Sequence, residues 1–436
     1  MEVNTQQNLI NVYAMGIDIS GDYTQISYII EGANEPKSLS IKPGEDKYLI
    51  PTLMYKIKNA EDWCIGDDAK HRSFEDNDES YVVRNLLERV YNKDVMYLDD
   101  VRYSGEKLLR IYIEELFKMA ERIEKLSRPK YVTITTTKAD KVFIDAAHKA
   151  LNKLEFEDEY VSVISHTESF IYYTLGQKKD LWINDVVLFD FNSEHFLYKK
   201  LSIARNKVPN IVTVKEYDYS EEIDITYLES ERDKRSADEK FLSIINREFY
   251  KQIISSVFLT GMGFYSDFAE NSLVELCSKR RVFKGHNLYV KGACLEANER
   301  RTGKAKDEYV LQCEGRTKVT IGLMINHNGR NTAAVLSKAG TNWYDAGAKA
   351  ECILDSTKSI QLVLSSPYDG CTKNVRIDLS SFPDRPNKTT RIAISLAYLN
   401  ETKCEVVVVD LGFGEFYKGT GIIVKETFAI DEMDAQ

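Results

Sequence analysis

Three short segments place an acidic or glycine residue at the end of an apolar run, where a phosphate or a hydrated metal ion could bind. The first runs from Met15 to Thr24 and contains Asp18 and Gly21. A carboxylate that leaves a strand into a glycine-containing hairpin can lie beside a metal-water shell, while backbone N–H groups face a phosphate. An ordinary tight β-turn explains the same residues, so both interpretations stay open.

The second segment runs from Leu188 to His195 and again ends an apolar run with an aspartate, Asp190. Asp190 and His195 could form an acid–base pair, but a histidine beside a strand is more often structural, and we assign no hydrolytic triad. No catalytic residue is therefore predicted here.

The third segment runs from Val257 to Ser266, where Gly261 and Gly263 separate a strand from a helix. Glycines at this position let the backbone approach a flat or anionic ligand at a helix N-terminus. Ser266 stands where a dinucleotide fold has its third glycine, and no GxxxxGK[ST] motif occurs, so a Rossmann or P-loop enzyme is set aside.

The composition describes a multi-domain globular chain of 436 residues with a net charge of −10. An acidic surface repels a phosphate backbone, so we predict no nucleic-acid partner. We also predict no membrane segment, because no apolar run approaches the ~20 residues that span a bilayer. The seven cysteines include no CxxC pair, which indicates reduced thiols in a cytoplasmic protein.

The elements that position these segments alternate between strands and helices over the first 300 residues. Predicted strands cover 14–19, 26–30, 131–136, 160–165, 185–190 and 256–259, and predicted helices cover 109–123, 143–154, 167–175, 266–278 and 290–299. A charge-dense stretch, 218–240, is predicted to be a solvated surface excursion.

From residue 309 onward, short alternating apolar runs separated by turns predict a second domain. These runs cover 318–325, 349–354, 359–365, 375–379, 391–399 and 405–410. Such a pattern is typical of an antiparallel β-sandwich. The predicted domains are therefore 1–305 and 306–436.

Taken in order, the segments resemble the actin-like ATPase superfamily, and most closely the 70-kDa heat-shock chaperones. Residues 15–29 resemble the family's first phosphate hairpin, 186–196 the second, and 257–268 the adenosine loop. Residues 383–415 resemble a strand pair of the chaperone's peptide-binding sandwich. The resemblance covers nearly the whole chain, and it implies an actin-like (ribonuclease-H-like) two-lobe α/β domain followed by an all-β sandwich.

The resemblance also implies a nucleotide site. Asp18 and Asp190 stand where the family uses metal-proximal aspartates, so they are the predicted Mg²⁺ positions. With them, Gly21, Gly261 and Gly263 are the predicted ATP- or ADP-binding residues.

The chain departs from the family at the phosphate turns. The first turn carries Asp22, the glycine triplet of the second is replaced by Asn192 to Glu194, and His166 stands in place of the catalytic glutamate, with Glu168 two residues later. A carboxylate ~4 Å from a phosphate costs on the order of 4 kcal/mol at an effective dielectric of about 20. We therefore predict that ATP or ADP with Mg²⁺ binds weakly or not at all.

The prediction is a chaperone-like scaffold with a degenerate nucleotide site that binds a protein or an extended peptide. In the resembling chaperones, sandwich loops arch over the peptide, and here those loops would lie near Arg330–Val335 and Asp355–Ile360. One alternative is an active ATP-dependent chaperone or actin-type ATPase. Another is a structural subunit that polymerises or docks onto a partner.

Overall fold

The chain forms two compact units in the computed structural model, which describes residues 9–430 except 43, 76–79, 304–308, 328 and 356. The first lies within Met1–Ser202 and Val214–Lys306, and the second within Ile203–Thr213 and Asp307–Gln436. The predicted boundary at residues 305 and 306 falls outside the described residues.

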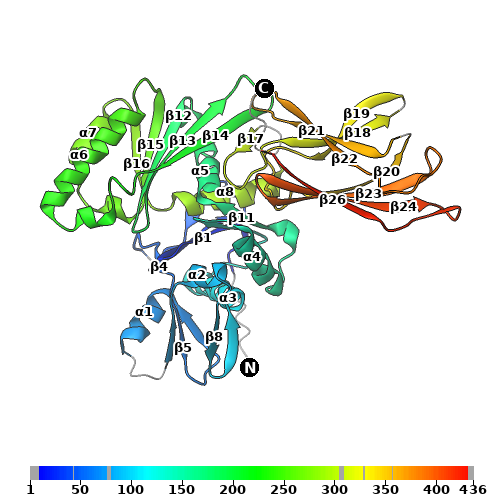
Figure 1. Ribbon diagram of the computed structural model, residues 1–436. Helices are drawn as coiled ribbons and strands as arrows, with labels where there is room; N and C mark the ends of the chain where they lie inside the picture. Colours follow the sequence, from blue (N-terminus) through cyan, green and yellow to red (C-terminus); the bar gives the residue numbers. More distant parts are fainter. Residues whose placement is uncertain are drawn as a thin grey trace. The chain divides into compact units, whose positions relative to one another are not determined.

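The α/β part of the chain, up to residue 303, contains two β-sheets whose first five strands follow the same order (Figure 1); residues 203–213 of the second sheet count with the second unit. One sheet is ordered β11 (Val161–Ser165), β10 (Tyr131–Thr136), β1 (Val12–Ile19), β2 (Tyr23–Ile30), β3 (Lys37–Ser38), with β4 (Ile50–Pro51) also on β2. The other is ordered β16 (Arg281–Lys284), β15 (Ile254–Thr260), β12 (Asp185–Phe191), β13 (Phe196–Ala204), β14 (Asn210–Asp218). In each, an antiparallel hairpin is followed by two parallel neighbours, so β1 and β12 are equivalent strands.

Helices follow the same order in both halves. After the first hairpin come α3 (Gly105–Glu124), α4 (Lys141–Lys153) and α5 (His166–Leu175), and after the second come α6 (Glu231–Glu248), α7 (Glu270–Cys277) and α8 (Leu288–Thr302). Between β4 and α3 the chain adds β5 (Met54–Ile57), β6 (Trp63–Ile65), α1 (Gly66–Glu75), β7 (Ser80–Val83), α2 (Leu86–Tyr91), β8 (Val95–Leu98) and β9 (Val101–Ser104).

Local sequence accounts for where these helices begin. The Ser104 hydroxyl accepts the Lys107 N–H at the start of α3. At the start of α5, Ser165 and Glu168 form a reciprocal capping box. In α3 the buried positions recur every three or four residues, which turns one face of the helix to the core.

Helices α5 and α8 cross between the two sheets, as Figure 1 shows. Their close approach depends on glycine, because a Cβ built on Gly292 would lie 1.9 Å from the Ser169 carbonyl oxygen. Helix α8 also packs on β1, where a Cβ on Gly16 would lie 2.4 Å from the Cys294 nitrogen. These contacts fix the ends of β1 and β12 beside the starts of the two helices.

Residues 218–240 were predicted to form a solvated surface excursion, and this prediction is wrong. Its second half is the start of α6, and Ile223 and Ala237 are fully buried. Asp238 is buried too, because its carboxylate accepts the N–H groups of Asn271 and Ser272 at the start of α7. Charge density alone predicted exposure, but an amphipathic helix buries one face whatever the charge of the other.

The second unit is a two-sheet β-sandwich. Its first sheet is ordered β19 (Arg330–Ser337), β18 (Thr320–His327), β21 (Ser359–Ser365), β22 (Thr372–Asp378). Its second sheet is ordered β20 (Ala348–Leu354), β23 (Thr390–Asn400), β24 (Lys403–Phe413), β25 (Tyr417–Lys418), with β26 (Ile423–Ala429) also on β24. Strand β17 (Tyr309–Gln312) pairs in parallel with residues 210–213 of β14.

One of the two predicted loops of this unit needs correction. Arg330–Val335, expected to be a loop, lies inside strand β19. The other, near Asp355–Ile360, does fall between β20, which ends at Leu354, and β21, which begins at Ser359, and its residue 356 lies outside the described residues.

Among the helices of the described residues, none has both the length and the apolar composition needed to cross a membrane.

We predict that Gly292→Ala lowers the free energy of unfolding by about 3 kcal/mol, the upper end for overpacking, because the new methyl group meets backbone rather than a flexible side chain. Urea unfolding followed by circular dichroism measures it. The matched control is Gly285→Ala, since no atom lies within 4 Å of a Cβ at that position. Equal stability of the two variants would contradict the described packing of α5 on α8.

Candidate functional site

The predicted residue Asp18 lies at the end of β1, where it is almost completely buried. Its Oδ1 is 2.8 Å from Nε2 of His166, the first residue of α5. Both side chains are at most one tenth exposed. Asp18 is therefore paired with a histidine from its own half of the unit.

Asp190 occupies the equivalent position at the end of β12 and is paired in a similar way. The Tyr289 hydroxyl, near the start of α8, donates to Asp190 Oδ2 at 2.7 Å. His195 Nε2 lies 3.2 Å from the same oxygen, so the pair noted in the sequence is in contact. Burial raises the pKa of Asp190, but the hydrogen bonds and charges of these partners outweigh burial and hold the pKa below its ordinary value.

His166 and Tyr289 join the two halves at this site. Their rings stack with centroids 4.0 Å apart and an interplanar angle of 9°. Burial, together with the charge of Asp190, raises the pKa of Tyr289 well above its ordinary value, so this hydroxyl keeps its proton. These side chains therefore form one continuous series of contacts, in the order Asp18, His166, Tyr289, Asp190. We call these four residues the plug.

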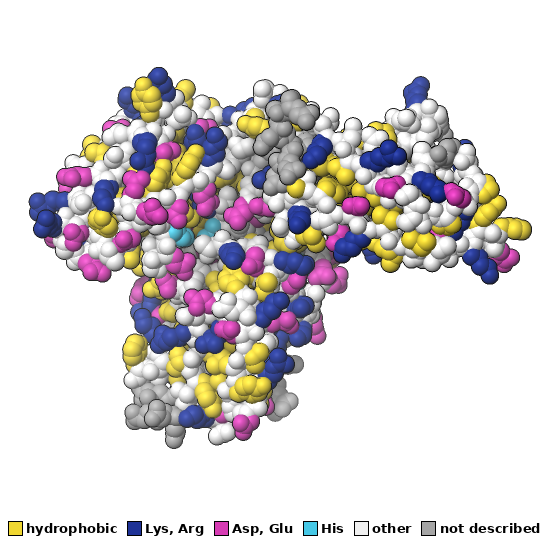
Figure 2. Space-filling model, viewed as in Figure 1, with side chains coloured by type: hydrophobic (Ala, Val, Ile, Leu, Met, Phe, Trp, Pro, Cys, Tyr) yellow, Lys and Arg dark blue, Asp and Glu magenta, His cyan; other side chains and the backbone are white. Residues whose placement is uncertain are grey.

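The two turns that follow these strands touch each other. Ser193 Oγ donates to Asp22 Oδ2 at 2.8 Å. A Cβ on Gly21 would lie 2.8 Å from Glu194 Oε1, so Gly21 faces a carboxylate. Figure 2 shows histidine side chains among acidic ones at the surface of this unit. The place between the turns is thus filled by the chain's own side chains, two of them acidic.

Gly261 and Gly263 pack against Phe191 rather than leaving an open surface. A Cβ on Gly261, which has φ +96°, would lie 2.1 Å from the Phe191 carbonyl oxygen. A Cβ on Gly263 would lie 2.3 Å from the Phe191 ring. Packing alone therefore requires both glycines, so a larger side chain at either position would disturb the fold.

An aromatic pair lies just beyond this loop. The rings of Tyr265 and His286 stack with centroids 3.8 Å apart and an interplanar angle of 9°. Burial and the nearby positive charge of Lys284 lower the pKa of His286 to about 4, against the opposing effect of Asp190. The imidazole is consequently neutral at physiological pH.

Neighbouring polar side chains are also engaged within the chain. Lys199, which is buried, donates to Thr167 and Glu216 at 2.7 Å each. Glu168 accepts the Ser165 N–H as part of the α5 capping box, so it has a structural role.

These residues do not fit a bound nucleotide with Mg²⁺. Asp18 and Asp190 are hydrogen-bonded to protein groups, and the two turns carry the carboxylates of Asp22 and Glu194. Within the described residues, no three His, Cys, Asp or Glu side chains gather in a way that could hold a metal ion.

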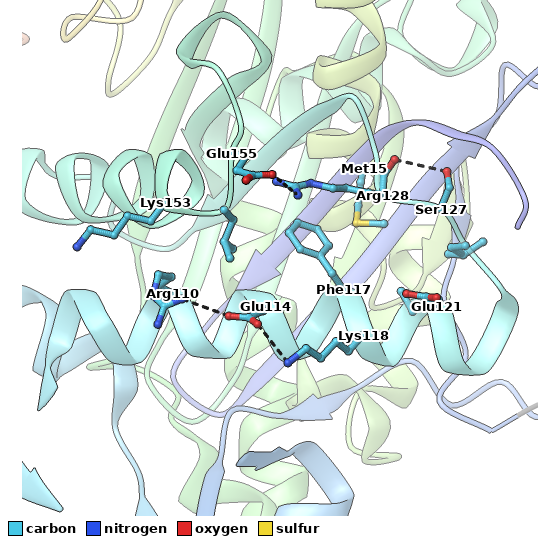
Figure 3. Close-up of a pocket in the computed structure, with 13 residues that line it drawn as sticks. Met15, Arg110, Glu114, Phe117, Lys118, Glu121, Ser127, Arg128, Lys153 and Glu155 are labelled. Atoms are coloured by element: carbon cyan, nitrogen blue, oxygen red, sulfur yellow. Dashed lines mark hydrogen bonds and ion pairs between the residues drawn. The ribbon is translucent and has the colours of Figure 1, made fainter. Parts of the chain in front are cut away.

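A pocket of about 420 Å³ lies elsewhere in this unit, alongside α3 (Figure 3). Met15 and Phe117 contribute apolar surface to it, and the charged groups on its rim pair with one another. Arg110 and Lys118 lie 3.3 and 3.2 Å from Glu114. None of the five predicted site residues lines this pocket.

The sequence singled out the two strand ends and the pair of Asp190 with His195, but it missed Tyr289, the second partner of Asp190. Asp18, Gly21, Asp190, Gly261 and Gly263 all fall in one region, linked by the plug and by Phe191. Tyr289 was not singled out. The available signal was its place at the start of α8, which corresponds to that of His166 at the start of α5.

The fold and this site define a duplicated α/β unit with an internally plugged centre, joined to a β-sandwich. A family model described as the C-terminal part of a family of unknown function, DUF5716, matches residues 35–314. The chain belongs to this family. A model of a domain of unknown function, DUF8552, matches residues 316–430. None of the curated proteins searched matches the chain.

We predict that the free energy of unfolding falls as pH is lowered from about 6.5 to about 4. The unfolded state takes up a proton on His286 in this range and the folded state does not, so stability is full above the range. His286→Phe keeps a ring on Tyr265 and should flatten this slope. Urea titrations at stepped pH test it, with His327→Phe at an exposed position as the control. An unchanged slope in His286→Phe would contradict the assignment.

Proposed function

We propose that this protein is a chaperone-like binding scaffold on an actin-like core, and that it acts without turning over a nucleotide. One observation carries the proposal: the two turns expected to face phosphate are closed on each other through Ser193 and Asp22. A triphosphate would have to break this contact and lie against two carboxylates.

The actin-like part of the proposal is supported by the duplicated topology. The two sheets share one strand order, and aspartates stand at equivalent strand ends. Two helices cross between the sheets, and a β-sandwich follows in the chain. This is the arrangement that the resemblance to the 70-kDa heat-shock chaperones implies.

We predict that calorimetric titration with ATP or ADP, with and without Mg²⁺, gives no binding tighter than about 1 mM. The physical reason is that the site is already filled by His166, Tyr289 and the turn carboxylates. A known ATP-binding protein measured alongside validates the assay. Magnesium-dependent hydrolysis that is lost in Asp18→Asn would instead establish the rival function, an active ATPase.

Binding of an extended partner is most plausible at strand β19. An edge strand offers unpaired backbone N–H and C=O groups, and lysine or proline normally protects it. Strand β19 carries one charge, Arg330, and no proline, and it pairs with β18 alone among the described strands. The other edge of the same sheet, β22, carries Lys373, Arg376 and Asp378. An extended peptide added as a further strand beside β19 would gain affinity from backbone hydrogen bonds to that edge.

The test uses the full chain and a fluorescein-labelled apolar heptapeptide, followed by fluorescence anisotropy. We predict that Ala333→Lys with Val335→Lys weakens binding at least about tenfold, because lysines on an edge strand oppose pairing. The matched control, Thr372→Lys with Asn374→Lys, adds the same charge to the outward positions of β22. If both double variants lost peptide affinity equally, the effect would come from the added charge. If neither lost affinity, β19 would be excluded as the peptide-binding site.

A further inference from the structure

The pocket alongside α3 is built from one stripe of that helix and from two segments that follow helix ends. Glu114, Phe117 and Glu121 recur at spacings of three and four, so they lie on one face of α3. Residues 126–128, which follow α3, and 153–155, at the end of α4, complete the lining (Figure 3). The volume of about 420 Å³ lies within the range of roughly 300–1,000 Å³ that small-molecule sites occupy. The apolar members of the lining are Met15, Phe117, Ala120, Leu126 and Leu154.

Most charged side chains around this pocket already hold a close partner of opposite charge. Glu114 lies 3.3 Å from Arg110 and 3.2 Å from Lys118. Lys153 lies 3.3 Å from Glu106. A ligand's charge would have to compete with a partner already in place at each of these groups.

Arg128 is in a different situation. Its guanidinium lies over the Phe156 ring, with Cζ 4.3 Å from the ring centroid, so stacking orients its plane. Within the described residues its one carboxylate partner is Glu155, which is 3.9 Å away, too far for a hydrogen bond, and whose side chain is 90% exposed. An ion pair this exposed contributes little to stability. The N–H groups of Arg128 are therefore available to an oxyanion.

The charges near Arg128 limit which ligand can bind there. The guanidinium itself repels a cation, and a phosphate dianion would meet the carboxylate of Glu155 with twice the charge of a carboxylate. A single carboxylate matches the planar fork of one arginine through two parallel N–H···O bonds. Figure 3 places Glu121 well apart from the contact of Arg128 with Glu155, and the Phe117 ring beside that contact. An apolar group attached to the carboxylate would reach this ring.

We propose that the pocket alongside α3 binds a small molecule that carries one carboxylate on an aromatic or short alkyl body. Arg128 binds the carboxylate, Phe117 and Met15 contact the apolar body, and Glu155 turns into solvent. Met15 lies on β1, three residues before Asp18, so the ligand contacts the strand that ends at the plug. This site is separate from the turns and from strand β19, and its test does not bear on nucleotide or peptide binding.

The test titrates hydrocinnamate, and separately its neutral amide, into the full chain with isotope-labelled methionine methyl groups. The expected result is that hydrocinnamate shifts the Met15 methyl resonance with a Kd between about 0.1 and 1 mM, and that the amide binds at least about tenfold more weakly. Met15→Leu, which nearly conserves volume, assigns the resonance. Equal affinity for the acid and the amide, or a Met15 resonance that does not move, would overturn the proposal.

Two variants with opposite expected effects test the role of Arg128. Arg128→Gln should weaken hydrocinnamate binding at least about tenfold, while Glu155→Gln should strengthen it about two- to fivefold because the competing carboxylate is gone. The matched control is Arg122→Gln, which removes the same charge from an exposed position of α3 outside the pocket and should change neither affinity. Circular dichroism confirms that each variant is folded.

The proposal is wrong if Arg122→Gln loses as much affinity as Arg128→Gln. It is also wrong if folded Glu155→Gln binds hydrocinnamate no more tightly than the wild type.

Discussion

The centre of this protein depends on the pairing of two buried carboxylates. Asp18 and Asp190 end equivalent strands and are largely removed from water, where an unpaired charge would be very costly. His166 pairs with the first and Tyr289 with the second, and the two rings stack on each other. This pairing decides how the strand ends, the two turns and the central helices are arranged.

Glycine residues allow the two central helices to come close enough for this pairing. Helix α5 must begin beside β1 and helix α8 beside β12 if their first residues are to reach the aspartates. Gly292 allows the two helix backbones to approach, and Gly16 allows α8 to rest on β1. Close packing also explains Gly261 and Gly263, because only residues without a Cβ let the chain pass over Phe191. Gly261 and Gly263 therefore have a packing role of their own.

A plugged centre changes what the duplicated unit can contribute to function. Open turns with free N–H groups would bind phosphate, but these turns bond to each other and carry acidic groups. On the proposed function, the α/β unit serves as a stable scaffold, and recognition falls to the sandwich. Within the sandwich, the edge of β19 is the surface to which the proposal assigns this recognition.

The sequence by itself determined the local elements and the position of the site. Apolar alternation and helical periodicity predicted the hairpins at 14–30, the strand at 131–136 and the helix at 167–175, because these patterns depend on neighbouring residues. Asp18 and Asp190 could be singled out for the same reason. The helix over 231–240 was missed, since its charges hid a buried face.

Only the tertiary structure decided what those aspartates do. Tyr289 lies 99 residues from Asp190 in the chain, and His166 lies 148 from Asp18, so no local pattern could pair them. The packing of Gly261 on Phe191 and the contact of Ser193 with Asp22 are equally non-local. Whether a site is open or filled depends on which distant side chains enter it, and that is fixed by packing across the whole unit rather than by residue type.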